Sequence, residues 1–162
     1  MSTQLMKKSE MAAFAAKEGA EVYHGEEICK QKVLQFLQEA GLPRGLFPLD
    51  NIVECGYVRD TGFVWLKRPK KIEYRFKTTG SLTSYAPEMS GYMEKGKMKK
   101  ISGVKVKELL VWFSLCELSI EDPNSGMIYC KTGVGVGKNV PIRVWEEEYD
   151  KYMCKSEANS NA

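Results

Sequence analysis

Apolar residues dominate one long stretch of the chain, residues 104–120. Within residues 109–118 only Ser114 and Glu117 are polar. A strand alternates its side chains between two faces, and this stretch would place apolar residues on both of them. A buried helix is the alternative, but the run lacks a polar stripe at helical spacing, is rich in aromatics and stops at a turn cluster at residues 122–126. We therefore predict a long central strand, covered on both sides and bent or shared between two sheets.

Helical spacing of apolar residues is confined to the N-terminal part of the chain. Ser9 can cap a short, Ala-rich helix over residues 10–17, which Gly19 would end. A second, amphipathic helix is predicted over residues 25–40, with Gly41 as its left-handed C-cap. One face of this helix should pack on a sheet, and it carries Cys29, Val33, Phe36, Leu37 and Ala40.

After a proline-containing connector at residues 42–48, the hydrophobic period becomes that of strands. Turn signals separate short predicted strands at residues 52–58, 62–67, 71–77, 89–94, 97–101, 126–131 and 134–145. This pattern predicts a mainly β fold, a barrel-like or sandwich antiparallel sheet preceded by an N-terminal helix, with a minor α+β character. We divide the chain into a partly helical N-terminal extension (1–20), a single β-rich domain with a leading helix (21–150) and a disordered tail (151–162).

The cysteines and the N-terminus bear on location. The chain has 5 cysteines, an odd number, with no CxxC or Cys/His cluster, so neither a disulfide scaffold nor a zinc site is expected. The only apolar run after Lys7 and Lys8 covers residues 11–16, which is too short for a signal peptide, and no stretch approaches the roughly 18 apolar residues of a membrane span. We expect a protein that is cytoplasmic or peripheral at the plasma membrane, not secreted, without transmembrane segment, cofactor or metal.

Charge is unevenly distributed along the chain. Residues 59–107 hold 13 Lys or Arg against 4 Asp or Glu, a net charge of +9 between two mildly acidic ends. If folding gathers these side chains, they make a positive surface for an anion, and each would attract an anionic lipid headgroup by about 1 kcal/mol. The alternative is a solvated face that keeps sheet edges from aggregating. The anion-binding candidates are Lys67, Arg68, Lys71, Arg75, Lys97, Lys99, Lys100, Lys105 and Lys107.

Catalytic motifs are missing from the sequence. His24 is the only histidine, and neither a Gly-x-Ser-x-Gly elbow nor an HExxH motif occurs. The Gly-rich residues 132–138 do not match a phosphate-binding loop, because Thr132 stands where Gly is required and Asn139 where Ser or Thr is required. We therefore predict no catalytic residues and expect a binding protein rather than an enzyme.

Several short motifs carry a family resemblance. They are Leu-Pro-Arg-Gly-Leu-Phe-Pro after a helix (42–48), Gly-Tyr-Val (56–58), Thr-Gly-Phe-Val-Trp-Leu (61–66), Ser-Gly (90–91), Lys-Gly-Lys (95–97), Ser-Gly-Val-Lys-Val-Lys (102–107), and residues 110–118 and 128–144. In this order, over residues 21–147, the chain resembles the plant proteins grouped as domain of unknown function 538. It is most similar to the intracellular branch associated with trichome development and stress responses.

The resemblance implies a mainly β, barrel-like fold preceded by helix. It also implies a likeness to lipid-binding proteins of the bactericidal/permeability-increasing type, with no catalytic residues to carry over. We expect a non-enzymatic binding module for an anionic lipid or amphiphilic small molecule at a membrane surface, in plant stress or developmental responses. The alternative is a small, esterase-like hydrolase with no recognisable catalytic motif. Nucleic acid is not an expected partner, because the basic block is not interleaved with aromatics in a known pattern.

Overall fold

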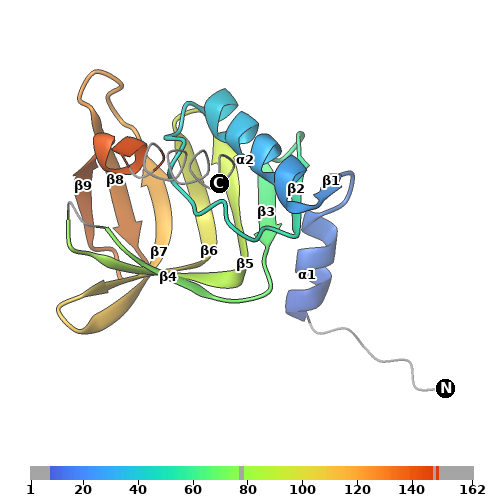
Figure 1. The fold of residues 1–162 in the computed structure, drawn as a ribbon, viewed down its shortest axis with the longest axis horizontal. Helices are drawn as coiled ribbons and strands as arrows, with labels where there is room; N and C mark the ends of the chain where they lie inside the picture. Colours follow the sequence, from blue (N-terminus) through green and yellow to red (C-terminus); the bar gives the residue numbers. More distant parts are fainter. Residues whose placement is uncertain (1–7, 77–78, 148, 150–162) are drawn as a thin grey trace, which may run out of the picture.

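The fold is an open antiparallel sheet of nine strands with a helix across one face (Figure 1). The computed structural model describes residues 8–76, 79–147 and 149. The strand order is β1-β2-β3-β5-β6-β7-β8-β9, and β4 also pairs with β5. The prediction of a mainly β, antiparallel protein with a helix near the N-terminus is confirmed, but the sheet is not closed into a barrel. The elements are α1 (Lys8–Ala16), β1 (Glu21–His24), α2 (Glu26–Ala40), β2 (Glu54–Val58), β3 (Phe63–Lys67), β4 (Ile72–Arg75), β5 (Leu82–Glu94), β6 (Lys97–Glu108), β7 (Val111–Ser119), β8 (Met127–Thr132) and β9 (Gly137–Pro141).

Helix α2 packs on one face of the sheet, which we call the inner face (Figure 1). All five predicted core residues of this helix are buried, and Gly41 ends it in the left-handed conformation (φ 71°), as predicted. Phe36 stacks on Tyr57 of β2 with ring centroids 4.8 Å apart. The connector after α2 and a helical turn at residues 143–147 add further side chains to the same core, among them Leu42, Leu46, Phe47, Leu49, Val144 and Trp145.

The C-terminal end of helix α1 and the turn that follows it lie at the opposite, outer face of the sheet, against β2 and β3. Val58, Phe63 and Trp65 form a small buried cluster there, and Ala16 and Ala20 pack on it. The outer face is therefore covered near β2 and β3, whereas its β4, β6 and β7 region carries many exposed side chains.

The prediction of one long central strand at residues 104–120 is wrong. The stretch is a hairpin, in which β6 ends at Glu108 and β7 begins at Val111. Leu109 and Leu110 form the turn, with φ of 49° and 72°. The apolar run is not interrupted at this turn because the turn consists of two leucines, and both are exposed in the described part of the chain.

The predicted strand at residues 134–145 is only partly right. Strand β9 spans Gly137–Pro141, and residues 143–147 are helical. Pro141 has no N–H to continue the ladder, and Val144 and Trp145 then turn into the core. The predicted disordered tail at residues 151–162 lies outside the described residues.

Candidate functional site

The pleat of the sheet decides where each predicted anion-binding residue points. On β6 the buried side chains of Met98, Ile101 and Val104 face inward, so the lysines between them face outward. Lys67 of β3 and Arg75 of β4 point to the same outer face by alternation with buried neighbours. The structure thus places eight of the nine candidates on one face: Lys67, Lys71, Arg75, Lys97, Lys99, Lys100, Lys105 and Lys107.

Arg68 does not belong to this surface, because its residue is only 3% exposed. Its guanidinium donates to the carbonyl oxygen of Pro48 at 2.7 Å. Desolvation lowers the pKa of this guanidinium from its ordinary value. Arg68 therefore serves the interior rather than an external anion.

Ion pairs neutralise half of the outward-facing candidates. Lys67 lies 3.4 Å from Glu54, Lys71 3.2 Å from Glu73, Lys97 3.7 Å from Glu117 and Lys99 3.1 Å from Glu94. A lysine held by a neighbouring carboxylate contributes little net positive potential. Arg75, Lys100, Lys105 and Lys107 are the candidates left without an acidic partner among the described residues.

Arg75, Lys105 and Lys107 lie together, and we call these three residues the cationic strip. Arg75 pairs with Leu82, which pairs with Lys107, so that β4, β5 and β6 place the two cations in one row. Lys107 in turn pairs with Trp112 of β7, and its Nζ lies 5.7 Å from the Trp112 ring centroid. Lys105 occupies the neighbouring row between two serines. Glu73 lies in the same row as Lys105, beyond Ser84, but Lys71 lies 3.2 Å from its carboxylate. The cationic strip therefore keeps a local excess of positive charge.

The cationic strip runs up to an exposed apolar turn. Leu109 is 96% exposed, Leu110 is 87% exposed and Val111 is 52% exposed. We call these three residues the β6–β7 tip. Both leucines have positive φ, a conformation in which a two-residue hairpin turn normally carries Asn-Gly and which costs other residues roughly 1–2 kcal/mol each. Since neither side chain packs on the described protein, this cost is not offset within the fold.

A second exposed apolar turn lies at the same end of the sheet. Leu115 of β7 pairs with Thr132 of β8, so residues before Leu115 lie beside those that follow Thr132. The N–H of Gly133 donates to the Ser114 carbonyl oxygen at 3.0 Å. Val134 and Val136, in this β8–β9 turn, are 68% and 66% exposed. We call Val134 and Val136 the β8–β9 tip.

The inner face holds a small apolar cavity of about 90 Å³. It lies on the side of the sheet opposite the cationic strip. Lys138 is the one charged residue among the described residues of its lining, and its Nζ lies 2.6 Å from Glu108 Oε1. Burial raises the pKa of the Cys130 thiol, another lining group, to about 12. Other lining residues include Phe76, Thr83, Val106, Leu115, Leu118 and Val140.

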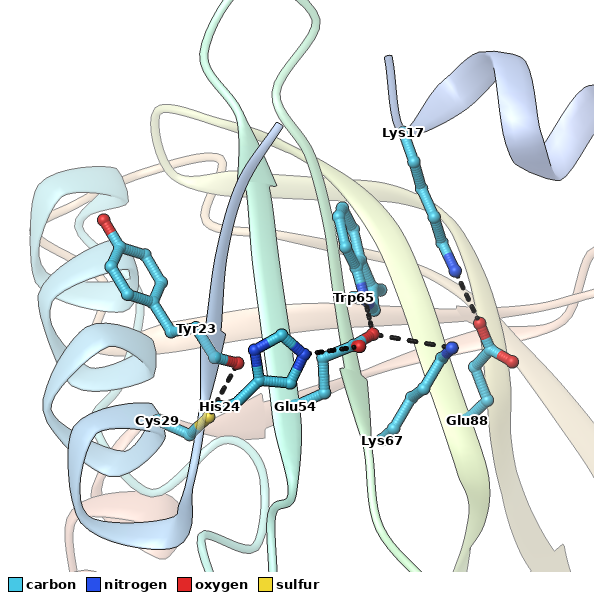
Figure 2. Close-up of polar contacts among 8 residues, drawn as sticks. All are labelled: Lys17, Tyr23, His24, Cys29, Glu54, Trp65, Lys67 and Glu88. Carbon is cyan, nitrogen blue, oxygen red and sulfur yellow. Dashed lines mark hydrogen bonds and ion pairs between the residues drawn. The ribbon is translucent and has the colours of Figure 1, made fainter. Parts of the chain in front are cut away.

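The single histidine makes one polar contact on the outer face. His24 Nε2 lies 3.1 Å from Glu54 Oε1, while Glu54 Oε2 accepts a hydrogen bond from Trp65 Nε1 at 2.8 Å and faces Lys67 at 3.4 Å (Figure 2). The Trp65 hydrogen bond is the main cause that lowers the pKa of Glu54 below its ordinary value, with smaller contributions from His24 and Lys67. Within the described part of the chain no hydroxyl or thiol is hydrogen-bonded to His24. The pair therefore lacks the nucleophile that a Ser/His/acid arrangement requires.

Among the residues that the structure describes, no group of three or more His, Cys, Asp or Glu side chains could hold a metal ion. In the same residues, no helix is both long enough and apolar enough to cross a bilayer.

Sequence reasoning missed the β6–β7 tip and the rim cation Lys138. The tip escaped because Leu109-Leu110 carries neither Gly nor Asn, so the apolar run contained no turn signal. One signal in the sequence could have located the tip: the alternation of lysines continues to Lys107 and ends at Glu108. Lys138 escaped because it stands alone between glycine and asparagine, outside the basic block.

The comparisons identify a family. A family model described as "Protein of unknown function, DUF538" matches residues 33–146. This match covers more than half of the chain, and the chain belongs to that family. The predicted family membership is therefore confirmed. Neither the search of curated proteins nor the search of solved structures found a match.

Proposed function

We propose that this protein is a non-enzymatic binding module that docks on an anionic lipid surface. The observation that carries the proposal is the cationic strip. Arg75, Lys105 and Lys107 lie in adjacent rows of one exposed face, without an acidic partner among the described residues. A surface of this kind attracts phosphate and carboxylate headgroups more than it attracts neutral ones.

The expected strength of this attraction is modest. A Lys or Arg near an anionic membrane contributes about 1 kcal/mol, so three of them contribute about 3 kcal/mol. The attraction is screened within a Debye length of about 8–10 Å, and binding should weaken as salt is added. Because the cytoplasmic leaflet of a plasma membrane carries most of its anionic lipid, we propose that leaflet as the site of action, with the protein peripheral to it.

Vesicle flotation tests the proposal. The protein is mixed with vesicles of phosphatidylcholine alone or of phosphatidylcholine with phosphatidylserine, at low and at physiological salt. We expect binding only to the vesicles that contain phosphatidylserine, and weaker binding at the higher salt. Equal and negligible binding to both vesicle types would refute the proposal.

A pair of double variants on the same strand locates the interaction. Lys105→Gln with Lys107→Gln removes two charges of the cationic strip, and we expect roughly 30-fold weaker binding from about 2 kcal/mol. The matched control, Lys97→Gln with Lys99→Gln, removes two charges of β6 that are held by Glu117 and Glu94. The control should bind much more tightly than the first variant. Equal losses would show that only the net charge matters, and would remove the cationic strip from the proposal.

The inner-face cavity favours a second ligand form, a free amphiphile with a short apolar chain. A cavity of about 90 Å³ is smaller than one that holds benzene, about 150 Å³, so it suits a few methylene groups rather than a whole acyl chain. Lys138 lines this cavity and would have to exchange the Glu108 carboxylate for the anionic head. Calorimetric titration with hexanoate and with hexanol tests this form, and we expect heat of binding only for hexanoate.

A further inference from the structure

We propose that the β6–β7 tip penetrates the hydrocarbon of an anionic bilayer, with the β8–β9 tip beside it at the interface. The inference deepens the proposed function, since it concerns the same membrane, but it assigns a different role to different residues. The cationic strip would attract the surface, and the tips would enter it. Electrostatic adsorption alone needs no apolar tip, so the two ideas can fail separately.

The exposure of the β6–β7 tip supports insertion into a bilayer. Leu109 and Leu110 are the two most exposed large apolar residues of the described chain, at 96% and 87%. Both also stand in the left-handed conformation that favours Asn or Gly. Exposed apolar residues in strained turns bury nothing inside the fold, which points to burial in something outside it.

The arrangement of side chains behind the tips also supports insertion into a bilayer. Trp112 follows the β6–β7 tip, is 38% exposed and lies beside Lys107. Tryptophan prefers the headgroup level of a bilayer, and lysine extends its ammonium toward phosphate while its stem stays in apolar surroundings. From the end of the molecule inward, the leucines come first, and one row that holds Trp112, Lys107 and Arg75 follows. This order matches hydrocarbon followed by the headgroup level of a bilayer.

The charges also decide between a bilayer and other occupants. A second copy of this chain docked tip to tip would bring Lys107 and Arg75 of one copy toward those of the other, which like-charge repulsion opposes. An anionic bilayer supplies both the hydrocarbon for the leucines and the negative charge for the cationic strip.

The turn itself allows a variant that should keep the fold. Leu109→Asn with Leu110→Gly places the preferred Asn-Gly sequence at two positive-φ positions. We expect a melting temperature equal to or above that of the wild type, together with at least roughly tenfold weaker binding to phosphatidylserine-containing vesicles. Phe14→Ser, which changes an exposed residue of α1 far from the tips in sequence (75% exposed), is the control and should bind as the wild type does.

Tryptophan fluorescence can report insertion, because adsorption to the membrane surface alone would not change it. Phosphatidylserine-containing vesicles are prepared with lipids brominated on the acyl chain, which quench only tryptophans at the hydrocarbon boundary. Trp65 and Trp145 are 4% and 8% exposed, so we expect quenching from Trp112 and its loss in Trp112→Phe.

The outcomes separate the two proposals. Salt-sensitive binding without quenching, unchanged by Leu109→Asn with Leu110→Gly, would overturn insertion and leave electrostatic docking intact. No binding to any vesicle would overturn both. A wild-type dimer that this double variant dissociates, with vesicle binding unchanged, would show that the tip contacts another copy and would also overturn insertion.

Discussion

The guanidinium of Arg68 donates to the carbonyl oxygen of Pro48 across 2.7 Å in the protein interior. This hydrogen bond joins the end of β3 to the connector that follows α2. The N–H of Arg68 also donates to the Pro87 carbonyl oxygen at 2.8 Å, and its Nε has no partner among the described residues. A cation that is 3% exposed and forms no ion pair with a carboxylate of the described residues is an uncommon structural element.

Two substitutions of Arg68 should distinguish the stability that its packing contributes from the stability that its buried charge costs. Arg68→Ala leaves a cavity and an unpaired Pro48 carbonyl, and we expect a loss of about 3 kcal/mol in the free energy of unfolding. Arg68→Met keeps an apolar stem and removes a buried charge, so it should cost at least about 1 kcal/mol less than Arg68→Ala. Urea unfolding followed by tryptophan fluorescence measures both. Equal losses in the two variants would mean that the charge is not a burden to the fold.

The placement of Arg68 shows how far a charge pattern can be interpreted. Lys67 and Arg68 are neighbours, and two neighbours on a strand cannot point to the same face. A run of basic residues therefore cannot place both side chains on one surface. Leu66 is buried, and alternation along the chain places Arg68 on the same inner side of the sheet. Ion pairs were equally invisible, because Glu117 and Glu94 meet Lys97 and Lys99 only after the strands have paired.

The helices and most strands were predictable because their signals are local. The face of α2 and its Gly41 cap follow from helical spacing and from the freedom of glycine at positive φ. The turn at Leu109-Leu110 was not predictable, because it depends on the pairing of β6 with β7 rather than on its own residues. The β6–β7 tip is thus the part of the candidate site that could be located only from the three-dimensional structure.

Glu54 should make a pH-dependent contribution to stability. Its folded pKa lies below the ordinary value of 4.5, chiefly through the Trp65 hydrogen bond. A group with a depressed folded pKa stabilises the fold above its unfolded pKa, and this stability is lost as the pH falls through the folded pKa. Glu54→Gln should therefore lower the free energy of unfolding at pH 7, and the difference from the wild type should shrink below pH 4.5.

Unfolding curves for the wild type and Glu54→Gln at several pH values between about 7 and 3 make this comparison. The pairwise difference is the informative quantity, because other carboxylates with lowered pKa, such as Glu21 and Glu26, titrate in both proteins. A difference that stays constant down to the lowest pH would contradict the assignment.

Gly56 should be intolerant of a side chain because of its partner on the next strand. Gly56 pairs with Trp65, and a Cβ at residue 56 would overlap the indole ring. That ring is 4% exposed and held by Glu54, so it has little room to move. We expect Gly56→Ala to lower the free energy of unfolding by about 1–3 kcal/mol.

Gly91→Ala is the matched control for this prediction. Gly91 is also a buried strand glycine, but the nearest atom to its added Cβ is Met98 Cε, the far end of a flexible side chain, at 2.5 Å. Methionine can adopt another rotamer, so the cost should be clearly smaller than that of Gly56→Ala. Thermal unfolding of both variants decides the comparison, and equal losses would mean that the Trp65 ring is free to move aside.

The thiol of Cys130 should report on the inner-face cavity. Burial raises its pKa to about 12, against an ordinary value of 9.0, and nearby Lys138 offsets only part of this effect. Because the thiolate is the nucleophile, alkylation by iodoacetamide at pH 8 should be roughly a thousandfold slower in the folded protein than in urea. Peptide mass mapping of quenched samples follows Cys130 separately from the other cysteines. Equal rates in the two conditions would show that the cavity opens freely to water, and the reaction rate should then rise by about tenfold between pH 8 and pH 10 as a thiol of ordinary pKa ionises.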